Sequence, residues 1–160
     1  MKDFLYLSLP LYALDQATKW WIVHEIEFQS ELRPIIPNFF YLCNWENTGA
    51  AFGMFKDNNL PFIVLSLAAL LGLVIFHLRG AFTDALSRVV VALLVGGILG
   101  NVTDRLVHNH VVDFLLFYLH IPGANPWPAF NVADSCICIA AALFILGSFR
   151  GQKAISSSPA

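Results

Sequence analysis

Two aspartates, Asp113 and Asp134, stand in apolar surroundings, within residues 111–114 and 131–135 of a chain of 160 residues. A charged carboxylate at the centre of a bilayer span costs roughly 2.5–3.5 kcal/mol on insertion scales, so an aspartate in such a place usually has a function. The two residues flank one turn-rich connection, residues 121–128. We therefore expect the two carboxyl groups to meet in space.

A pair of close carboxyl groups has a specific chemistry. Two like charges in a poorly solvated site cannot both form cheaply, so the pair keeps one proton near neutral pH. The ionised member can take a proton from water while the protonated member polarises a carbonyl group. This arrangement hydrolyses an amide without a covalent intermediate, and it needs neither a metal nor a cofactor.

Other catalytic arrangements are weaker in this sequence. Ser135 has a possible base in His108 or His110, but no G-x-S-x-G motif surrounds it. Asp104 and the two histidines do not form an H-E-x-x-H motif, and histidines two residues apart point to different faces of a helix. A serine hydrolase and a metal site are therefore both disfavoured.

The composition indicates a membrane protein. Hydrophobic residues make up 58% of the chain and charged residues 12%, whereas a soluble domain has about 25% charged residues. The net charge of −2 gives no electrostatic basis for binding nucleic acid. Cys136 and Cys138 point to different faces of a predicted helix, so no disulfide is expected there. Cys43 is expected to be a free thiol or a packed core residue.

The pair must be positioned by membrane helices. A span needs about 20 mostly apolar residues, and four segments meet this requirement: 4–23, 60–78, 88–107 and 129–149. The first contains Pro10, Asp15 and Lys19 but has no small-x-small cleavage site, so we interpret it as an uncleaved span. The predicted fold class is an all-α membrane protein with four transmembrane helices and a small extracytoplasmic β-sheet in the first outward loop.

An even number of spans places both termini on one side of the membrane. Basic residues favour the cytoplasmic side, and those flanking the termini side are Lys2, Arg79, Arg88, Arg150 and Lys153, against Arg33 and Lys56 in the opposite loops. Both termini are therefore predicted to be cytoplasmic. Residues 1–150 are expected to form a single domain, and residues 151–160 a polar, disordered tail.

The outward loop, residues 24–59, is too long to be a simple connection. Its aromatic stretch 38–45 is bounded by Pro37 and by Asn47-Thr48-Gly49, which is typical of a strand followed by a turn. We expect a small sheet here, lying on the membrane surface.

Polar residues inside the third predicted span share one helix face. Asn101, Asp104, Arg105 and His108 follow i, i+3, i+4, i+7 spacing. They form either a packed polar seam or part of a site, and for Asp104 the two interpretations are equally favoured. Gly96, Gly97 and Gly100 precede this face and permit close helix approach.

Two further groups of polar residues lie on the first and fourth predicted spans. Asp15 and Lys19 are four residues apart and can neutralise one another, which favours a tie within the helix bundle. Asn131, Asp134 and Ser135 begin the fourth span. The turn residues of 121–128 end one helix and start another, so both aspartates are predicted to lie at the outward ends of adjacent helices.

These residues form five blocks that occur in one order along the chain. They are Asp15-x-x-Thr18-Lys19, Asn47-Thr48-Gly49-Ala50-Ala51-Phe52-Gly53, Gly96-Gly97-x-x-Gly100-Asn101-x-x-Asp104-Arg105, Val111-Val112-Asp113-Phe114 and Phe130-Asn131-Val132-Ala133-Asp134-Ser135. In this order they resemble the bacterial lipoprotein signal peptidase (signal peptidase II) family, over most of the chain.

The resemblance implies an aspartic intramembrane protease of the bacterial inner membrane, with its active site near the outer face. Its substrates would be prolipoproteins that carry diacylglycerol on a cysteine, cleaved immediately before that cysteine. The resemblance also implies contact with membrane lipid, inhibition by the cyclic peptide globomycin, and no metal.

The resemblance also implies roles for individual residues. Asp113 and Asp134 match the catalytic dyad. Residues matched to the substrate site are Asn47, Gly49, Asn101, Arg105 and Asn131. Residues matched to structural support are Asp15, Lys19 and Asp104. The segment from Asn47 to Gly53 offers backbone amides and little side-chain bulk, which suits an extended peptide, although its residues alone favour a plain glycine turn.

Two other functions remain compatible with intramembrane aspartates. A proton-coupled transporter would use Asp15, Asp104, Asp113 and Asp134 as a relay, but the chain shows no inverted repeat. A membrane scaffold would use the face from Gly96 to Gly100, which leaves the cost of Asp113 and Asp134 unexplained.

Overall fold

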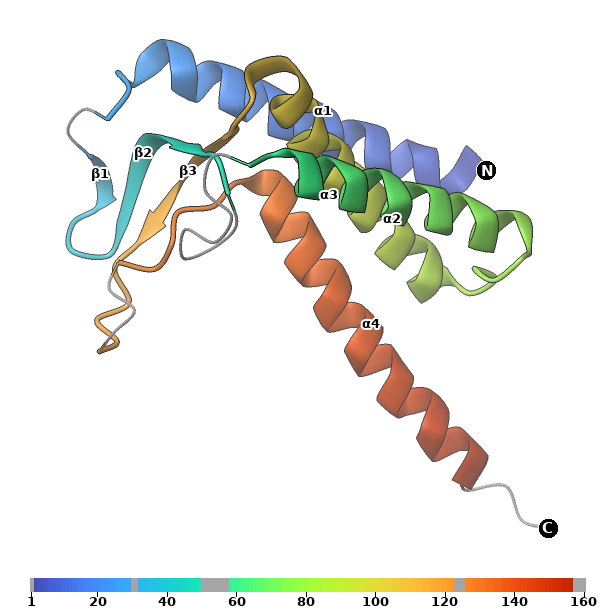
Figure 1. Ribbon diagram of the computed structural model, residues 1–160. Coiled ribbons are helices and arrows are strands. Elements are labelled where there is room, and N and C mark those ends of the chain that lie inside the picture. Colours follow the sequence, from blue (N-terminus) through green and yellow to red (C-terminus); the bar gives the residue numbers. More distant parts are fainter. Residues whose placement is uncertain (1, 30–31, 50–57, 123–125, 157–160) are drawn as a thin grey trace.

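The computed structural model describes residues 2–29, 32–49, 58–122 and 126–156 (Figure 1). The described residues form four helices and three strands, in the order α1 (Lys2–Glu25), β1 (Arg33–Ile36), β2 (Phe40–Asn47), α2 (Leu60–Leu78), α3 (Ala85–His108), β3 (Val111–Phe117) and α4 (Val132–Ser156). Figure 1 shows the sheet at one end of the molecule and the helices extending away from it.

Three of the described helices are long and apolar enough to cross a membrane: Leu60–Leu78, Ala85–His108 and Val132–Phe149. The bounds of α2 match the predicted span. The helix α1 has 24 residues, but Asp15, Gln16 and Lys19 make its second half polar, so its role as a fourth span stays a prediction. The helix α4 continues to Ser156, beyond Gly151 where the disordered tail was expected to begin.

The central helix is α3, which packs against both α1 and α4. Its three glycines make this possible. A Cβ atom on Gly96 would lie 3.1 Å from the Ser8 carbonyl oxygen of α1, and one on Gly97 would lie 2.5 Å from the Ala133 carbonyl oxygen of α4. The predicted close helix approach is thus confirmed. In contrast, α2 has no buried residue, as expected for a helix facing lipid.

The sheet is antiparallel, in the order β1-β2-β3. Its third strand corrects the prediction that the sheet belongs to the first outward loop, because β3 comes from the connection between α3 and α4. It also corrects the placement of Asp113 at a helix end. The helix α3 ends at His108, Asn109 turns the chain with a φ of 61°, and Asp113 then lies on β3.

The prediction of Asp113 at a helix end was wrong for a physical reason. Residues 111–117 form a short apolar run whose first four residues are all buried, so they lack the alternation that distinguishes a half-buried strand from a buried helical segment. Two apolar clusters fix the elements around the strand. Ile22 of α1 and Ile26, the residue after that helix, pack with Val112 and Phe114 of β3. The second cluster joins α3 to α4 through Val90, Leu93, Cys136 and Ala140.

Candidate active site

Asp113 lies within β3, opposite Trp45 of β2, and its side chain is buried. Both carboxylate oxygens accept hydrogen bonds from side-chain amides. Asn47 Nδ2 donates to Oδ2 at 2.8 Å, and Asn131 Nδ2 donates to Oδ1 at 2.8 Å. Asp113 is therefore held between the end of β2 and the start of α4.

Asp134 is the third residue of α4, and Asn131 immediately precedes that helix. The Asn131 Oδ1 atom accepts the backbone N–H of Asp134 at 2.9 Å. In return, Asp134 Oδ2 accepts the backbone N–H of Asn131 at 3.3 Å. This reciprocal pair is a capping box, which satisfies two N–H groups at the helix start. Asn101 Nδ2 of α3 donates to Asp134 Oδ1 at 2.6 Å.

The structure brings the two aspartates into one hydrogen-bond network, because Asn131 contacts both. The pKa of Asp113 is raised from 3.8 to about 7, first by burial and second by the charge of Asp134, against the opposing hydrogen bonds from Asn47 and Asn131. Such a group is poised to hold or release a proton at neutral pH.

A second polar cluster lies behind Asn101. Lys19 Nζ contacts Asp15 Oδ2 at 2.8 Å, Asp104 Oδ2 at 2.9 Å and Asn101 Oδ1 at 3.1 Å. The predicted pairing of Asp15 with Lys19 is confirmed, and the ammonium group ties α1 to α3. Asp15 Oδ1 also accepts the backbone N–H of Ala133 at 2.8 Å, which ties α1 to α4.

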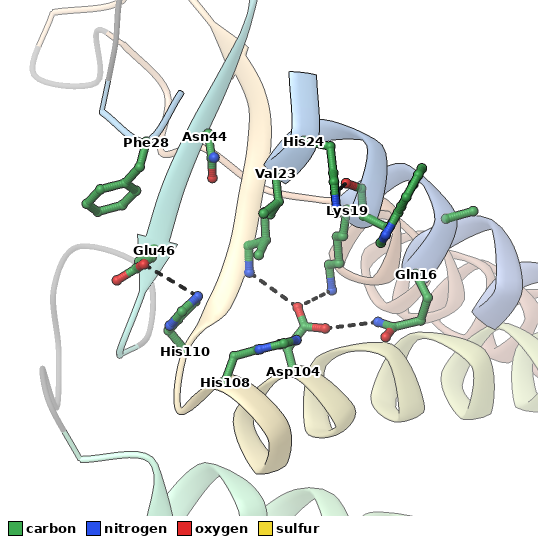
Figure 2. A pocket seen from close by; sticks show the side chains of 13 residues that line it. Gln16, Lys19, Val23, His24, Phe28, Asn44, Glu46, Asp104, His108 and His110 are labelled. Carbon is green, nitrogen blue, oxygen red and sulfur yellow. Dashed lines mark hydrogen bonds and ion pairs between the residues drawn. The ribbon is translucent and has the colours of Figure 1, made fainter. Parts of the chain in front are cut away.

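Gln16 is a member of this cluster that sequence reasoning did not assign. Its Nε2 atom donates to Asp104 Oδ1 at 2.9 Å and to Asp15 Oδ2 at 3.2 Å. Figure 2 shows Gln16 and Lys19 converging on Asp104 at one side of a cavity of about 690 Å³. The signal available in the sequence was the position of Gln16 beside Asp15, on the same polar half of α1.

His108 lies apart from the residues with which it shares a helical spacing. Asn101, Asp104 and Arg105 are buried, whereas His108 is exposed and lines the cavity with His110. His110 in turn pairs with Glu46 at 3.6 Å.

Arg105 joins α3 to the segment after β2. Its Nη2 atom donates to the Gly49 carbonyl oxygen at 3.2 Å, and its guanidinium carbon lies 4.9 Å from the Phe62 ring centroid. The buried Nε atom has no hydrogen-bond partner among the described residues. Gly49 also donates its N–H to Asn47 Oδ1 at 3.0 Å. The rest of the predicted peptide-binding segment, residues 50–53, lies outside the described residues.

Comparison with known proteins identifies the family. The family model for signal peptidase (SPase) II matches residues 7–150. The chain belongs to the signal peptidase II family. It is 40% identical over 153 residues to the lipoprotein signal peptidase of Neisseria gonorrhoeae, covering 92% of this chain and 89% of that protein. It is also 40% identical over 160 residues to that of Aeromonas hydrophila, covering 98% and 93%.

Solved structures agree with this assignment. One bacterial membrane enzyme has a TM-score of 0.89 and 26% identity, covering 100% of this chain and 95% of that chain. A second has a TM-score of 0.80 and 28% identity, covering 92% of each chain. As a member of the signal peptidase II family, the protein is a membrane-embedded aspartic endopeptidase, as the sequence predicted.

In the described part of this signal peptidase II chain, no group of three or more histidine, cysteine, aspartate or glutamate side chains is arranged to hold a metal ion. Cys43, Cys136 and Cys138 are all free thiols. The Cys43 side chain lies against β3, where its Sγ atom is 3.7 Å from the Asp113 carbonyl oxygen, and its pKa is raised to about 12, mainly by burial.

Proposed function

We propose that this protein removes the signal peptide from diacylglyceryl-modified prolipoproteins, cutting immediately before the lipidated cysteine, with Asp113 and Asp134 as the catalytic dyad. The observation that carries the proposal is the shared amide of Asn131. It holds Asp113 through Nδ2 at 2.8 Å and the backbone N–H of Asp134 through Oδ1 at 2.9 Å. A buried and a partly buried carboxyl group linked in this way suit the activation of one water molecule.

The surroundings of the dyad support peptide binding. Arg105 presents a buried Nε donor without a described partner, and it holds the Gly49 carbonyl beside Asn47, which contacts Asp113. We assign Arg105, Asn47 and Gly49 to the side of the site where an extended peptide lies. A backbone carbonyl of the substrate is the group that a free guanidinium N–H would bind.

The membrane location supports a lipid-anchored substrate. The helix α2 exposes apolar side chains along its length, so we expect it to contact membrane lipid. We propose that the protein lies in the bacterial inner membrane, with both termini in the cytoplasm and the dyad near the outer face. A globomycin-type cyclic peptide would then compete with the substrate for the site.

The test uses purified protein in detergent with a diacylglyceryl-modified prolipoprotein peptide. Asp113→Asn and Asp134→Asn remove one carboxyl group each at nearly constant volume, and we expect each to lower the cleavage rate by on the order of 10³-fold or more. The product is identified by mass spectrometry as the peptide that begins with the lipidated cysteine.

The matched control is Asp84→Asn. Asp84 is an exposed carboxylate that caps α3 by accepting the Ser87 N–H at 2.9 Å, and asparagine is an equally good cap. We expect this variant to cleave at the wild-type rate. Normal cleavage by both dyad variants, folded as judged by circular dichroism, would overturn the proposal and leave proton transport as the alternative to test in proteoliposomes.

A further inference from the structure

The two aspartates have different surroundings, although the chemistry needs one of them ionised and the other protonated. Asp113 lies on a strand and accepts hydrogen bonds from two neutral side-chain amides. Burial is the main reason that its pKa is raised to about 7. The two amide hydrogen bonds favour a negative charge on Asp113, but they do not offset its burial and the charge of Asp134.

Asp134 lies at the start of a long helix. It occupies the third position of α4 and forms the capping box with Asn131. The N-terminus of a helix carries the positive end of the helix dipole, and a carboxylate there is stabilised in its charged form. This setting favours a negative charge on Asp134.

A second feature near Asp134 is a chain of contacts from Lys19 through Asn101, which we call the Lys19 relay. An ammonium group has three N–H donors, and the contacts of Lys19 to Asp15, Asp104 and Asn101 use all three. Because the Asn101 oxygen faces this ammonium group, its NH₂ group must face Asp134, which it reaches at 2.6 Å. The positive charge polarises the amide and strengthens its N–H as a donor.

Two further charged groups, Arg105 and Asp15, lie near the pair and act in opposite directions. Among the carboxylates near Arg105, Asp134 interacts most strongly with its guanidinium group, ahead of Asp113 and Asp104. Desolvation is the main factor that opposes a charge on Asp134, and the hydrogen bond from Asn101 and the charge of Lys19 counter it. Asp15 also opposes this charge, but it is itself paired with Lys19.

The other elements near the two aspartates contribute little charge. From β2, Cys43 is a neutral thiol because its pKa is about 12. Glu46 is exposed and pairs with His110, which follows α3. The charges that matter therefore come from α1 and α3.

From these contacts we infer that Asp134 is the ionised member of the dyad and Asp113 carries the shared proton, and that Lys19 and Asn101 are positioning residues that hold this arrangement. The inference rests on the proposed dyad. It also reassigns Asn101 and Asn131. We expected both to bind substrate, but the NH₂ group and the oxygen of each side chain are already engaged within the protein.

The assignment orders the proton transfers. Asp134 takes one proton from water as the water oxygen bonds to the scissile carbonyl carbon, while Asp113 gives its proton to the carbonyl oxygen. When the C–N bond breaks, the leaving nitrogen takes the proton from Asp134. Asp113 recovers a proton from the hydroxyl group that becomes the new carboxyl carbonyl, so the dyad returns to its starting state.

The proton is located by infrared titration of the purified protein in detergent. A protonated carboxyl group has a C=O band that vanishes on ionisation. We expect the Asp134→Asn variant to keep a band that vanishes at a pH below 7, because the charge of Asp134 no longer raises the pKa of Asp113, and the Asp113→Asn variant to lack it.

Two infrared results would overturn the inference. One is the opposite pattern, with the band kept in Asp113→Asn and lost in Asp134→Asn. The other is loss of the band in both variants, since a proton that requires both carboxyl groups belongs to neither. These readouts do not depend on cleavage, so failure of the proposed function, seen as cleavage by both variants, is a separate outcome.

A second experiment tests the positioning role through Asn101→Leu, a variant of similar shape that cannot donate to Asp134. Loss of a hydrogen bond to a charged group corresponds to a pKa shift of about 1–2 pH units. We expect the acid limb of the kcat/KM profile to move to higher pH by about that amount, with KM nearly unchanged. An unchanged profile with a raised KM would show a substrate contact and overturn the positioning role.

Two further variants complete this experiment. Gln16→Met removes another polar side chain of the Lys19 cluster that does not reach Asp134, and it should keep the wild-type profile. Lys19→Arg preserves the positive charge and should shift the acid limb less than Asn101→Leu does. A larger shift in Gln16→Met than in Asn101→Leu would contradict the relay. The infrared measurement uses only the dyad variants, so it decides the proton assignment even if Asn101→Leu does not fold.

Discussion

At the scale of single residues, Asp113 combines a catalytic position with a cost in stability. Its pKa of about 7 lies above the ordinary value of 3.8. Between these values the unfolded chain releases the proton while the folded protein keeps it. Stability therefore falls as the pH rises through this window, and the cost is complete above pH 7. The full cost is on the order of a few kcal/mol.

This cost predicts a pH-dependent stability difference for Asp113→Asn. The variant has no carboxyl group to ionise, so its melting temperature relative to the wild type should rise from pH 4 to pH 8. Thermal unfolding in detergent, followed by circular dichroism at several pH values, measures the difference.

The control for this measurement is Asp84→Asn, at a fully exposed position. Hydrogen bonds from Ser87 lower the pKa of Asp84, so the stability that its charge provides is lost only on acidification. Its melting-temperature difference should be flat between pH 5 and pH 8. An equally flat difference for Asp113→Asn would contradict the raised pKa of Asp113.

At the scale of elements, the distance between α3 and α4 sets the position of Asp134. A Cβ atom on Gly97 would lie 2.5 Å from the Ala133 carbonyl oxygen and 2.8 Å from Ile137 Cγ1. Gly97→Ala must therefore move the two helices apart at the residue before Asp134. We expect a loss of about 1–3 kcal/mol in stability and a lower cleavage rate, measured by thermal unfolding and the peptide assay.

Gly72 of α2 provides the matched control. A Cβ atom there would have no neighbour within 4 Å, and alanine is favoured over glycine inside a helix by about 0.5–1 kcal/mol. Gly72→Ala should therefore be neutral or slightly stabilising, with full activity. Equal tolerance of both substitutions would show that the contact between α3 and α4 does not position the site.

At the scale of the whole molecule, the orientation in the membrane is still a prediction, and so is α1 as a fourth span. A cysteine-free variant carrying Glu27→Cys or Thr83→Cys tests the orientation, because α2 separates these two exposed positions. We expect a membrane-impermeant maleimide to label Glu27→Cys in intact spheroplasts and Thr83→Cys only after lysis. A tag before Met1 should be protected in the same way if α1 spans the bilayer.

Two labelling patterns would contradict this topology. Reversed labelling of the two cysteines would invert the orientation. Labelling of the tag in intact spheroplasts, together with Glu27→Cys, would show that α1 lies on one side of the membrane.

The local sequence was sufficient for the features that depend on neighbours along the chain. The apolar run 60–78 predicted α2 with its observed bounds, and the four-residue spacing of Asp15 and Lys19 predicted their ion pair. Apolar surroundings pointed to Asp113 and Asp134 because an unexplained carboxylate in a membrane is costly.

Only the tertiary structure decided how the two aspartates differ. Lys19 and Asn101 are 82 positions apart, and Asp15 and Ala133 are 118 positions apart, so no periodicity along the chain relates them. The direction of each asparagine amide follows from which charged group faces its oxygen. Asp113 was assigned to a helix end because a buried strand and a buried helical segment have the same apolar pattern. Packing against α1 and β2 placed it on β3.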